Sequence, residues 1–327
     1  MPLQTMTPSN RLQRFVIAAG LALLATASQA ERFDFVALGD MPYGPRDKAY
    51  PPYENLIGLV NRAQPAFTIH VGDFKSGSSP CTDEEFENQR VFFNRFDAAL
   101  VYTPGDNEWT DCHRSGGDPI ERLARLREMF FAQPLSLGKT PLAVQRQSDL
   151  MPPFALYREN LRFQRAGVLF VTLHIVGSNN NFEVRDIKAV QEFMARDAAN
   201  IAWIRDAFEQ ARSLNARGMV FALQADPFET KMPWGDFPPH SGFTASIGET
   251  LLPLAEAWGQ PVLLIHGDSH RFVIDQPFKG KSGRPMQNLV RLEVYGAPEV
   301  HAVRVTVDTD NPSVFGYTPL FNPMSPR

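Results

Sequence analysis

Short apolar runs alternate with amphipathic segments along most of this chain. Runs that are apolar on both faces and bounded by turn residues are typical of buried strands in a largely parallel sheet. We expect such strands at 33–38, 67–71, 100–102, 168–176, 219–223 and 262–266. One helix is predicted to begin with Asp118 as its N-cap and Pro119 as its first residue, and a second to cover about 198–212. This alternation predicts an α/β fold.

The pattern changes after position 270. Segments 289–295 and 300–308 alternate apolar and polar residues, and we expect them to pair with each other as a meander at a sheet edge. Segments 41–53 and 232–242 are rich in Pro and Gly, and they are predicted to be long loops that form walls of a cleft. The length of 327 residues allows one large α/β domain or two small ones.

The first thirty residues differ from the rest of the chain. Arg11 and Arg14 precede an uncharged run over 15–25, and small residues follow at Ala27-Ser28-Gln29-Ala30. This arrangement is typical of a secretory signal peptide, although an uncleaved N-terminal anchor is the alternative. No other segment is apolar enough to cross a bilayer. We therefore expect a signal peptide over 1–30, one domain over 31–327, and a periplasmic or secreted protein.

The charge of the chain argues against a nucleic-acid partner. The formal net charge is −4, and segment 1–30 carries two arginines and no acid, so the mature chain has about −6. No stripe of basic residues offsets this negative charge. Hydrophobic residues make up 43% of the sequence, which predicts a substantial core.

Acidic or metal-liganding residues follow five of the predicted strands or short apolar runs. Because the carboxyl ends of parallel strands face one crevice, we expect these side chains to converge. Several carboxylates in one pocket raise each other's pKa unless a cation compensates, so the pattern predicts a metal site. The turns are Gly39-Asp40, Gly72-Asp73, Gly105-Asp106-Asn107, Gln224-Ala225-Asp226 and Gly267-Asp268-Ser269-His270.

The two cysteines, Cys81 and Cys112, both lie in predicted loops shortly after acidic turns. In an exported protein such a pair favours a disulfide, which for a loop of this length could stabilise the fold by roughly 3 kcal/mol. Two free thiols or a thiolate metal site are the alternatives.

The order and approximate spacing of the acidic turns resemble those of the calcineurin-like metallophosphoesterases, which include the purple acid phosphatases. The resemblance extends from Phe33 to about Val307. It implies a four-layered α/β sandwich, with two mixed sheets flanked by helices and a centre for two metal ions between the sheets. It also implies hydrolysis of a phosphorylated small molecule, either a monoester or a diester.

The resemblance assigns roles residue by residue. Asp40 matches a ligand of the first metal, Asp73 the aspartate that bridges both metals, and His270 the last histidine ligand. The other positions depart from the family pattern: Asp106 replaces an asparagine, and Pro42, Gln224 and Asp268 each replace a histidine. Asp106, Gln224 and Asp268 remain oxygen donors.

This donor set predicts a harder metal than is usual in the family. Carboxylate and amide oxygens favour Mn²⁺, Mg²⁺ or Ca²⁺, whereas imidazole suits zinc and iron. Asp226 competes with Gln224 for one ligand position, and Tyr43 is either a ligand of the first metal or a wall of the cleft. The sequence leaves both alternatives open.

Asn107 stands where the family has a catalytic histidine. An asparagine can donate a hydrogen bond to a phosphoryl oxygen but cannot be a general acid. His113, His266 and Glu108 are the candidates to replace that acid. Lys75, which closely follows Asp73, and Arg114, which follows Cys112, are predicted to offer positive charge to the phosphate of the substrate. Asn180, in a Gly-Ser-Asn-Asn turn after a predicted strand, is predicted to donate a hydrogen bond to the substrate.

Two hypotheses from different classes follow. The first is an exported, metal-dependent hydrolase of phosphate esters in which Asp73, Asn107 and His270 are catalytic. The second is an inactive protein that keeps the fold and binds a metal or an anion, and it is motivated by the missing family histidines. A nucleotide-binding Rossmann enzyme fits less well, because no Gly-x-Gly-x-x-Gly turn follows the first strand.

Overall fold

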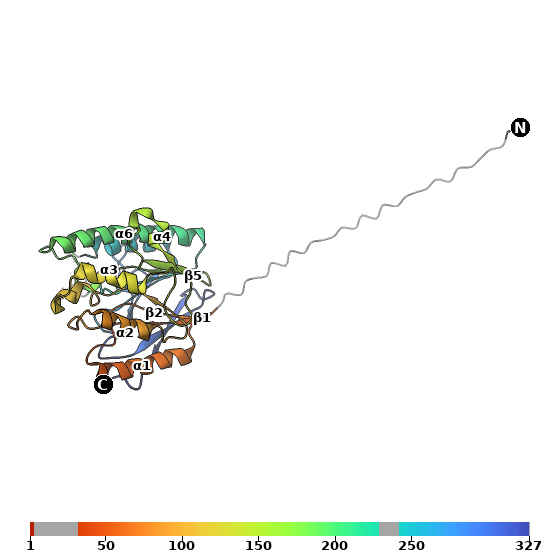
Figure 1. Cartoon of the computed structure of the whole chain (residues 1–327). Helices are drawn as coiled ribbons and strands as arrows, with labels where there is room; N and C mark the ends of the chain where they lie inside the picture. The colour runs from red at the N-terminus through yellow and green to blue at the C-terminus, as the bar shows by residue number, and fades with distance from the viewer. Residues whose placement is uncertain (3–31, 229–241, 327) are drawn as a thin grey trace.

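A computed structural model of the chain describes residues 1–2, 32–228 and 242–326. Two mixed sheets form its centre, and helices cover their outer faces (Figure 1). This arrangement confirms the predicted fold class. The strands are β1 (Phe33–Leu38), β2 (Phe67–His70), β3 (Ala99–Tyr102), β4 (Gln145–Arg146), β5 (Leu161–Arg165), β6 (Val168–Thr172), β7 (Gly218–Ala222), β8 (Val262–His266), β9 (Val273–Asp275), β10 (Leu289–Glu293), β11 (Ala302–Val307) and β12 (Phe315–Leu320).

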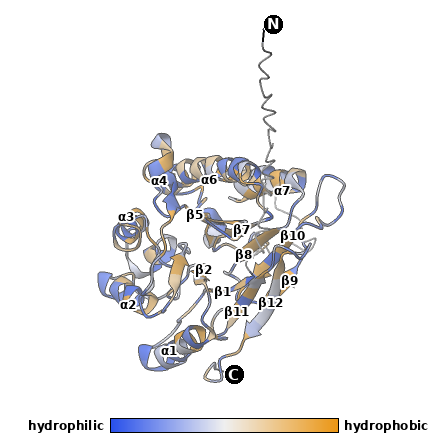
Figure 2. Ribbon diagram, turned by 90° about the vertical axis from the view of Figure 1, so that its right-hand side faces the viewer, coloured by the Kyte–Doolittle hydropathy of each residue, from blue (hydrophilic) through white to orange (hydrophobic). Residues whose placement is uncertain are grey.

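The helices lie in two groups on opposite sides of the sheets, with α1, α2 and α3 on one side and α6 and α7 on the other (Figure 2). Several shorter turns connect the larger elements. The helical segments are α1 (Arg46–Ala63), α2 (Asp83–Phe93), η1 (Thr110–Ser115), α3 (Pro119–Phe130), α4 (Gln147–Leu150), η2 (Pro152–Phe154), α5 (Gly177–Asn180), α6 (Ile187–Ser213), η3 (Thr244–Leu251) and α7 (Leu252–Trp258).

The strand order places the ends of the parallel strands side by side. The first sheet has the order β12-β11-β1-β2-β3, and the second has the order β4-β5-β6-β7-β8-β10-β9. β1, β2 and β3 are parallel to one another, and so are β6, β7, β8 and β10. The loops that follow these strands are therefore held at one edge of each sheet.

Aromatic side chains join the two sheets into one core. Phe170 of β6 lies edge-on to Phe35 of β1, with ring centroids 5.6 Å apart, and to Phe67 of β2, with centroids 5.0 Å apart. A second apolar cluster, which includes Trp203 and Phe208 of α6, packs on the other face of the second sheet. This packing fixes the two sheets relative to each other, and with them the loops at their edges.

Local sequence accounts for the start of α3. Asp118 is its N-cap and accepts hydrogen bonds from the backbone N–H groups of Ile120 and Glu121, and Pro119 is the first helical residue. Both features were predicted, and they match the preference for Asp at the N-cap and Pro at N1. The predicted helix at 198–212 is the second half of α6, which is a longer helix.

Two predictions about secondary structure are wrong. Segment 41–53 is not one loop, because α1 begins at Arg46 and continues through Pro51 and Pro52. Residues at helical spacing in α1, including Tyr53 and Leu56, are fully buried, and this packing outweighs the cost of the prolines. Segment 232–241 lies outside the described residues.

The expected meander of segments 289–295 and 300–308 does not form. β10 pairs with β8 and β9 in the second sheet, whereas β11 pairs with β1 and β12 in the first. The connection through Gly296 crosses from one sheet to the other, and there each strand has a hydrogen-bonded neighbour on both sides, which a hairpin of the two alone would not provide.

The predicted disulfide between Cys81 and Cys112 is present, with 5.6 Å between the Cα atoms. It ties the loop before α2 to η1. The predicted signal peptide falls almost entirely outside the described residues. Among the helices that the structure describes, none is long and apolar enough to span a membrane.

Candidate active site

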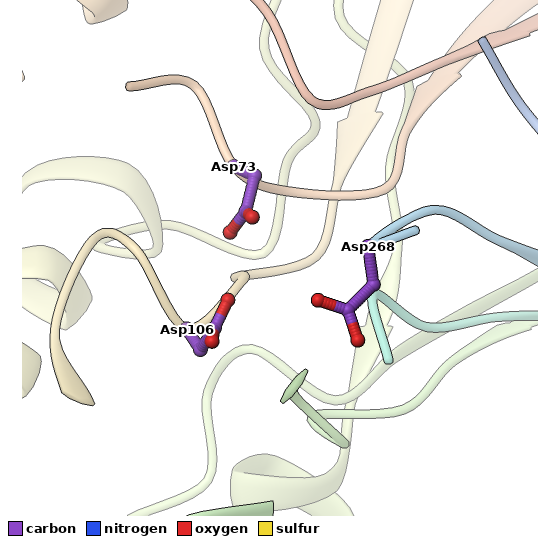
Figure 3. A group of neighbouring side chains, drawn as sticks. All are labelled: Asp73, Asp106 and Asp268. Atoms are coloured by element: carbon purple, nitrogen blue, oxygen red, sulfur yellow. The ribbon is translucent and has the colours of Figure 1, made fainter. Parts of the chain in front are cut away.

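Three aspartates meet at the edge of the two sheets (Figure 3). Asp73 follows β2, Asp106 follows β3, and Asp268 follows β8. One carboxylate oxygen of each lies within 4.8 Å of the others, and Asp73 and Asp106 are almost fully buried. We call these residues the aspartate triad. The convergence of acidic turns that the sequence predicts is therefore present for all three.

Gln224 lies in the centre of the aspartate triad, but with its nitrogen rather than its oxygen facing the carboxylates. The amide Nε2 lies 3.2 Å from Asp73 Oδ2, 3.2 Å from Asp106 Oδ1 and 3.0 Å from Asp268 Oδ1. The amide oxygen instead accepts a hydrogen bond of 2.5 Å from the backbone N–H of Gly177. This corrects the expected orientation, since Gln224 here donates to the acids and does not present an oxygen ligand.

Asp40 and His270 form the second half of the site. Asp40 is fully buried after β1, and its Oδ1 lies 3.7 Å from His270 Nε2. His270 Nδ1 lies 2.7 Å from the carbonyl oxygen of Ala297, to which it donates, so Nε2 carries the lone pair that faces Asp40. A carboxylate and an imidazole lone pair directed at one point suit a divalent cation.

Tyr43 and Asn107 link both halves through Asp73. The Tyr43 hydroxyl donates to Asp73 Oδ2 at 3.0 Å, and the Asn107 side-chain amide donates to the same oxygen at 2.6 Å and to the Tyr43 hydroxyl at 2.7 Å. The Tyr43 ring packs edge-on against His270, with centroids 5.2 Å apart. Tyr43 thus lies in the site itself and is more than a cleft wall.

Burial raises the pKa of the acids in this site. The pKa of Asp73 lies well above its ordinary value because the side chain is buried and because Asp106 and Glu108 are close. The pKa of Asp40 is raised by burial, and nearby Asp106 adds to this effect. The pKa of Tyr43 is also raised, by burial and then by Asp73, so its hydroxyl keeps its proton. Without a cation, the ionised cluster is unfavourable.

Glycines let the turns carry these acids close to one another. A Cβ at Gly105 would collide with the carboxylate of Asp73, and a Cβ at Gly267 would collide with that of Asp40. Asp40 Oδ2 has no hydrogen-bond partner among the described residues, although it is buried. A buried acceptor without a donor, next to further carboxylates, fits a divalent cation as the missing partner.

Glu108 and Lys75 form hydrogen bonds with the backbone of the segments that carry the site. Glu108 Oε1 accepts hydrogen bonds from the backbone N–H of Asp73 at 2.8 Å and from the Tyr102 hydroxyl at 2.9 Å. The buried Lys75 ammonium donates to the carbonyl oxygens of Asn107 at 2.6 Å and Ser76 at 2.9 Å. Lys75 therefore holds the Asn107 loop, and substrate binding by Lys75 stays a prediction.

Ser178 and Asp111 also reach the site, and we did not single them out from the sequence. The Ser178 hydroxyl donates to Asp106 Oδ2 at 2.6 Å and lies 3.1 Å from Asp111 Oδ1. Burial and the neighbouring Asp106 raise the pKa of Asp111 to about 6. Ser178 begins a run of four residues with positive φ, and its only sequence signal was the Gly-Ser-Asn-Asn turn.

Arg114, Asn180 and Asp226 are the remaining residues that the sequence predicts for the site. Arg114 forms an ion pair of 2.5 Å with Asp111 beside the aspartate triad. Asn180 is buried, accepts from Arg196 and donates to Gly242, so its side chain positions loops. The Asp226 side chain points away from the triad, because it bonds Ser269 Oγ at 2.7 Å and lies 3.8 Å from Arg291. Gln224, and not Asp226, therefore contacts the side chains of the triad, and which of the two binds a metal stays a prediction.

No protein-family model and no curated protein matches this sequence. Solved structures do match it, at low identity. A dimetal phosphatase from Danio rerio superposes with a TM-score of 0.51 and 10% identity, over 89% of this chain and 99% of that one. The chain has the metallophosphoesterase fold. A purple acid phosphatase from yellow lupin seeds also matches, with a TM-score of 0.48 and 12% identity, over 89% of this chain and 54% of that one. The calcineurin-like phosphoesterase YfkN from Bacillus subtilis matches with a TM-score of 0.44 and 9% identity, over 89% of this chain and 90% of that one.

Proposed function

We propose that the chain is an exported, metal-dependent hydrolase of phosphate esters. The observation that carries this proposal is the meeting of Asp40 and His270 with the aspartate triad at the ends of parallel strands, where the backbone N–H of Asp268 donates to Asp40 Oδ1 at 3.0 Å. The fold, which is shared with a dimetal phosphatase, agrees with it. The signal-like N-terminus and the disulfide support export, because disulfides form in oxidising compartments.

In the proposed reaction, a water molecule gives up a proton to the solvent as its oxygen forms a new bond to phosphorus, and the ester bond to the alcohol oxygen breaks. Asp73, Asp106 and Asp268 would hold divalent cations, which would supply Lewis-acid stabilisation of the charge on the phosphoryl group. The Asn107 amide and the Tyr43 hydroxyl are the polar hydrogen donors nearest to Asp73 Oδ2, so they are placed to orient a phosphoryl oxygen. The departing alcohol oxygen takes up a proton.

His113 is the best-placed source of that proton. Of the three candidates, His266 and Glu108 are fully buried, whereas His113 lines a cavity of about 650 Å³ that Ser178 and Asp111 also line. His113 Nδ1 donates to the carbonyl of Thr110 at 2.7 Å, which leaves Nε2 available. A histidine there can protonate a leaving alcohol.

Replacing His113 by glutamine is expected to slow poor leaving groups selectively. A positioned acid contributes about a hundredfold or more, so kcat on an alkyl phosphate should fall by at least about tenfold, and kcat on a nitrophenyl phosphate by less than about threefold. Steady-state kinetics with a series of leaving groups measure this difference. His301→Gln, outside the site, is the matched control. An equal loss on both substrates would assign His113 a structural role.

The metal preference tests the donor set. The protein should bind Mn²⁺ or Mg²⁺ in preference to Zn²⁺ at equal concentration, because the aspartate triad offers only oxygen ligands and His270 is the one imidazole directed at the site by the described residues. Elemental analysis after dialysis against mixed metals measures this preference, and release of phosphate from an aryl phosphate tests activity. Retention of zinc alone would refute the hard-ligand assignment. One tightly held Ca²⁺ without turnover would favour the binding protein.

A further inference from the structure

We propose that a groove between α3 and α6 binds the organic part of the substrate, and that the substrate is the phosphate ester of an amphipathic alcohol with an apolar chain. This inference rests on the proposed function, because it assigns the alcohol side of the same reaction. The two helices belong to opposite helix groups, but residues of both line the same cavity. Figure 1 shows α3 below α6.

Two adjoining cavities form the groove. The first has a volume of about 650 Å³, and the second has about 710 Å³. Asp118, Ile120 and Lys188 line both, so the two cavities lie side by side. Pockets for small molecules typically measure about 300–1,000 Å³, so the groove has room for more than a phosphate group.

The first cavity begins at the candidate active site. Ser178 and Asp111 are part of its wall, and the Ser178 hydroxyl donates to Asp106 of the aspartate triad. His113, the proposed acid for the leaving group, lines the same cavity. An ester whose phosphoryl group lies at the triad therefore directs its alcohol into this cavity and onward along the groove.

The groove has a larger share of apolar side chains at greater distance from the site. The first cavity carries charged side chains, among them Arg114 and Glu183. Half of the twelve residues that line the second are apolar, namely Ile120, Leu123, Ala124, Leu156, Tyr157 and Ala195, and the other half are polar or charged. This gradient matches an alcohol with a polar part near the phosphate and an apolar part beyond it.

Two charged residues that line the second cavity, Arg127 and Glu192, already have partners. Arg127 forms bidentate hydrogen bonds with Glu159, and its guanidinium lies 5.3 Å from the centre of the Tyr157 ring. Glu192 is paired with Arg196. These charges therefore do not require a charged ligand, and the groove offers carbon surface for an apolar chain.

Exposed apolar side chains extend this surface at the rim. Leu156 lines the second cavity and is 60% exposed. Ile187 and Met194 of α6 are adjacent in sequence to the lining residues Lys188 and Ala195, and both are more than 60% exposed. Lys188 makes no ion pair among the described residues, so its methylenes can cover an apolar chain while its ammonium faces the polar end of the groove.

Chain-length dependence tests the groove. Phosphate release would be measured from butyl, octyl and dodecyl phosphate below their micelle concentrations, with 4-nitrophenyl phosphate as the compact substrate. We expect kcat/KM to rise by at least about tenfold from butyl to octyl, because added methylenes are buried. In Ala195→Trp and Ala124→Trp, whose new side chains would fill the second cavity, the octyl-to-butyl ratio should fall towards one. Ala198→Trp, an exposed position of α6 outside the groove, should keep the ratio.

Calorimetric binding of ethyl- and octylphosphonate to the metal-loaded protein separates the two proposals, because phosphonates are not hydrolysed. One outcome is that octylphosphonate binds more tightly than ethylphosphonate, that Ala195→Trp removes this difference, and that no ester is hydrolysed. This outcome supports the groove and refutes the proposed function. Hydrolysis of 4-nitrophenyl phosphate without any dependence on chain length overturns the groove and leaves the function intact. A third outcome would also overturn the inference. If the protein does not distinguish alkyl chains but binds an amphipathic helical peptide, and Ala195→Trp removes this binding, the groove belongs to a protein partner.

Discussion

Replacement of Asp73 by asparagine is expected to reduce kcat/KM for an aryl phosphate by more than about a thousandfold, because losing a charged ligand removes several kcal/mol of transition-state stabilisation. Asp73 is the residue that connects both halves of the site: it belongs to the aspartate triad, and its Oδ2 accepts from Tyr43 and Asn107. The same substitution should lower the amount of Mn²⁺ that the protein retains, measured by elemental analysis.

Asp310→Asn is the matched control for this experiment, because Asp310 is exposed in the turn before β12. It should keep both metal content and activity. Unchanged hydrolysis by the Asp73→Asn protein would remove the basis of the proposed function. Circular dichroism of both variants would exclude unfolding as the cause of a loss.

The Asp73→Asn protein is also expected to be more stable than the wild type when metal is removed by a chelator at pH 8, by several degrees in Tm. Burial and nearby acids raise the pKa of Asp73 in the folded state above its unfolded value. Its contribution to stability is therefore present in full below about pH 4 and is lost as pH rises through the raised pKa. Asparagine does not ionise, so the advantage of the variant should disappear towards pH 4.

Thermal unfolding of both proteins between pH 4 and pH 8 measures this difference. The comparison with the variant cancels the opposing effect of buried histidines such as His70 and His266, whose pKa values are lowered by burial in both proteins. Saturating Mn²⁺ should reverse the order at pH 8, because a ligand that binds the folded wild type stabilises it. If the wild type remains more stable than the variant in chelator at pH 8, burial and nearby acids do not raise the pKa of Asp73 as we infer.

The sequence predicts the convergence of the acids better than it predicts their contacts. Asp40, Asp73, Asp106 and Asp268 each follow a short apolar strand, and strand ends of parallel sheets face one edge, so local pattern is sufficient to bring them together. The orientation of Gln224 could not be predicted in this way. It depends on a hydrogen bond to the backbone of Gly177, which is 47 residues away in the chain.

Long-range packing also decides the elements that the sequence misplaces. The prolines of α1 suggest a loop, and only the core against which Tyr53 packs shows that a helix is stable there. Segments 289–295 and 300–308 alternate as hairpin strands do, yet partners in different sheets separate β10 from β11. Strand pairing depends on neighbours that lie far away in the chain, and no local pattern contains that information.

The sequence by itself determines the α/β class, the disulfide partners, the start of α3 and the set of acids at the strand ends, because these depend on periodicity, capping and the order of short segments. Only the tertiary structure decides which atom of Gln224 faces the aspartate triad, that Ser178 and Asp111 join the site, and that a groove leads from it between α3 and α6. These features arise from contacts between residues far apart in the chain, and packing of the two sheets and their helices fixes such contacts.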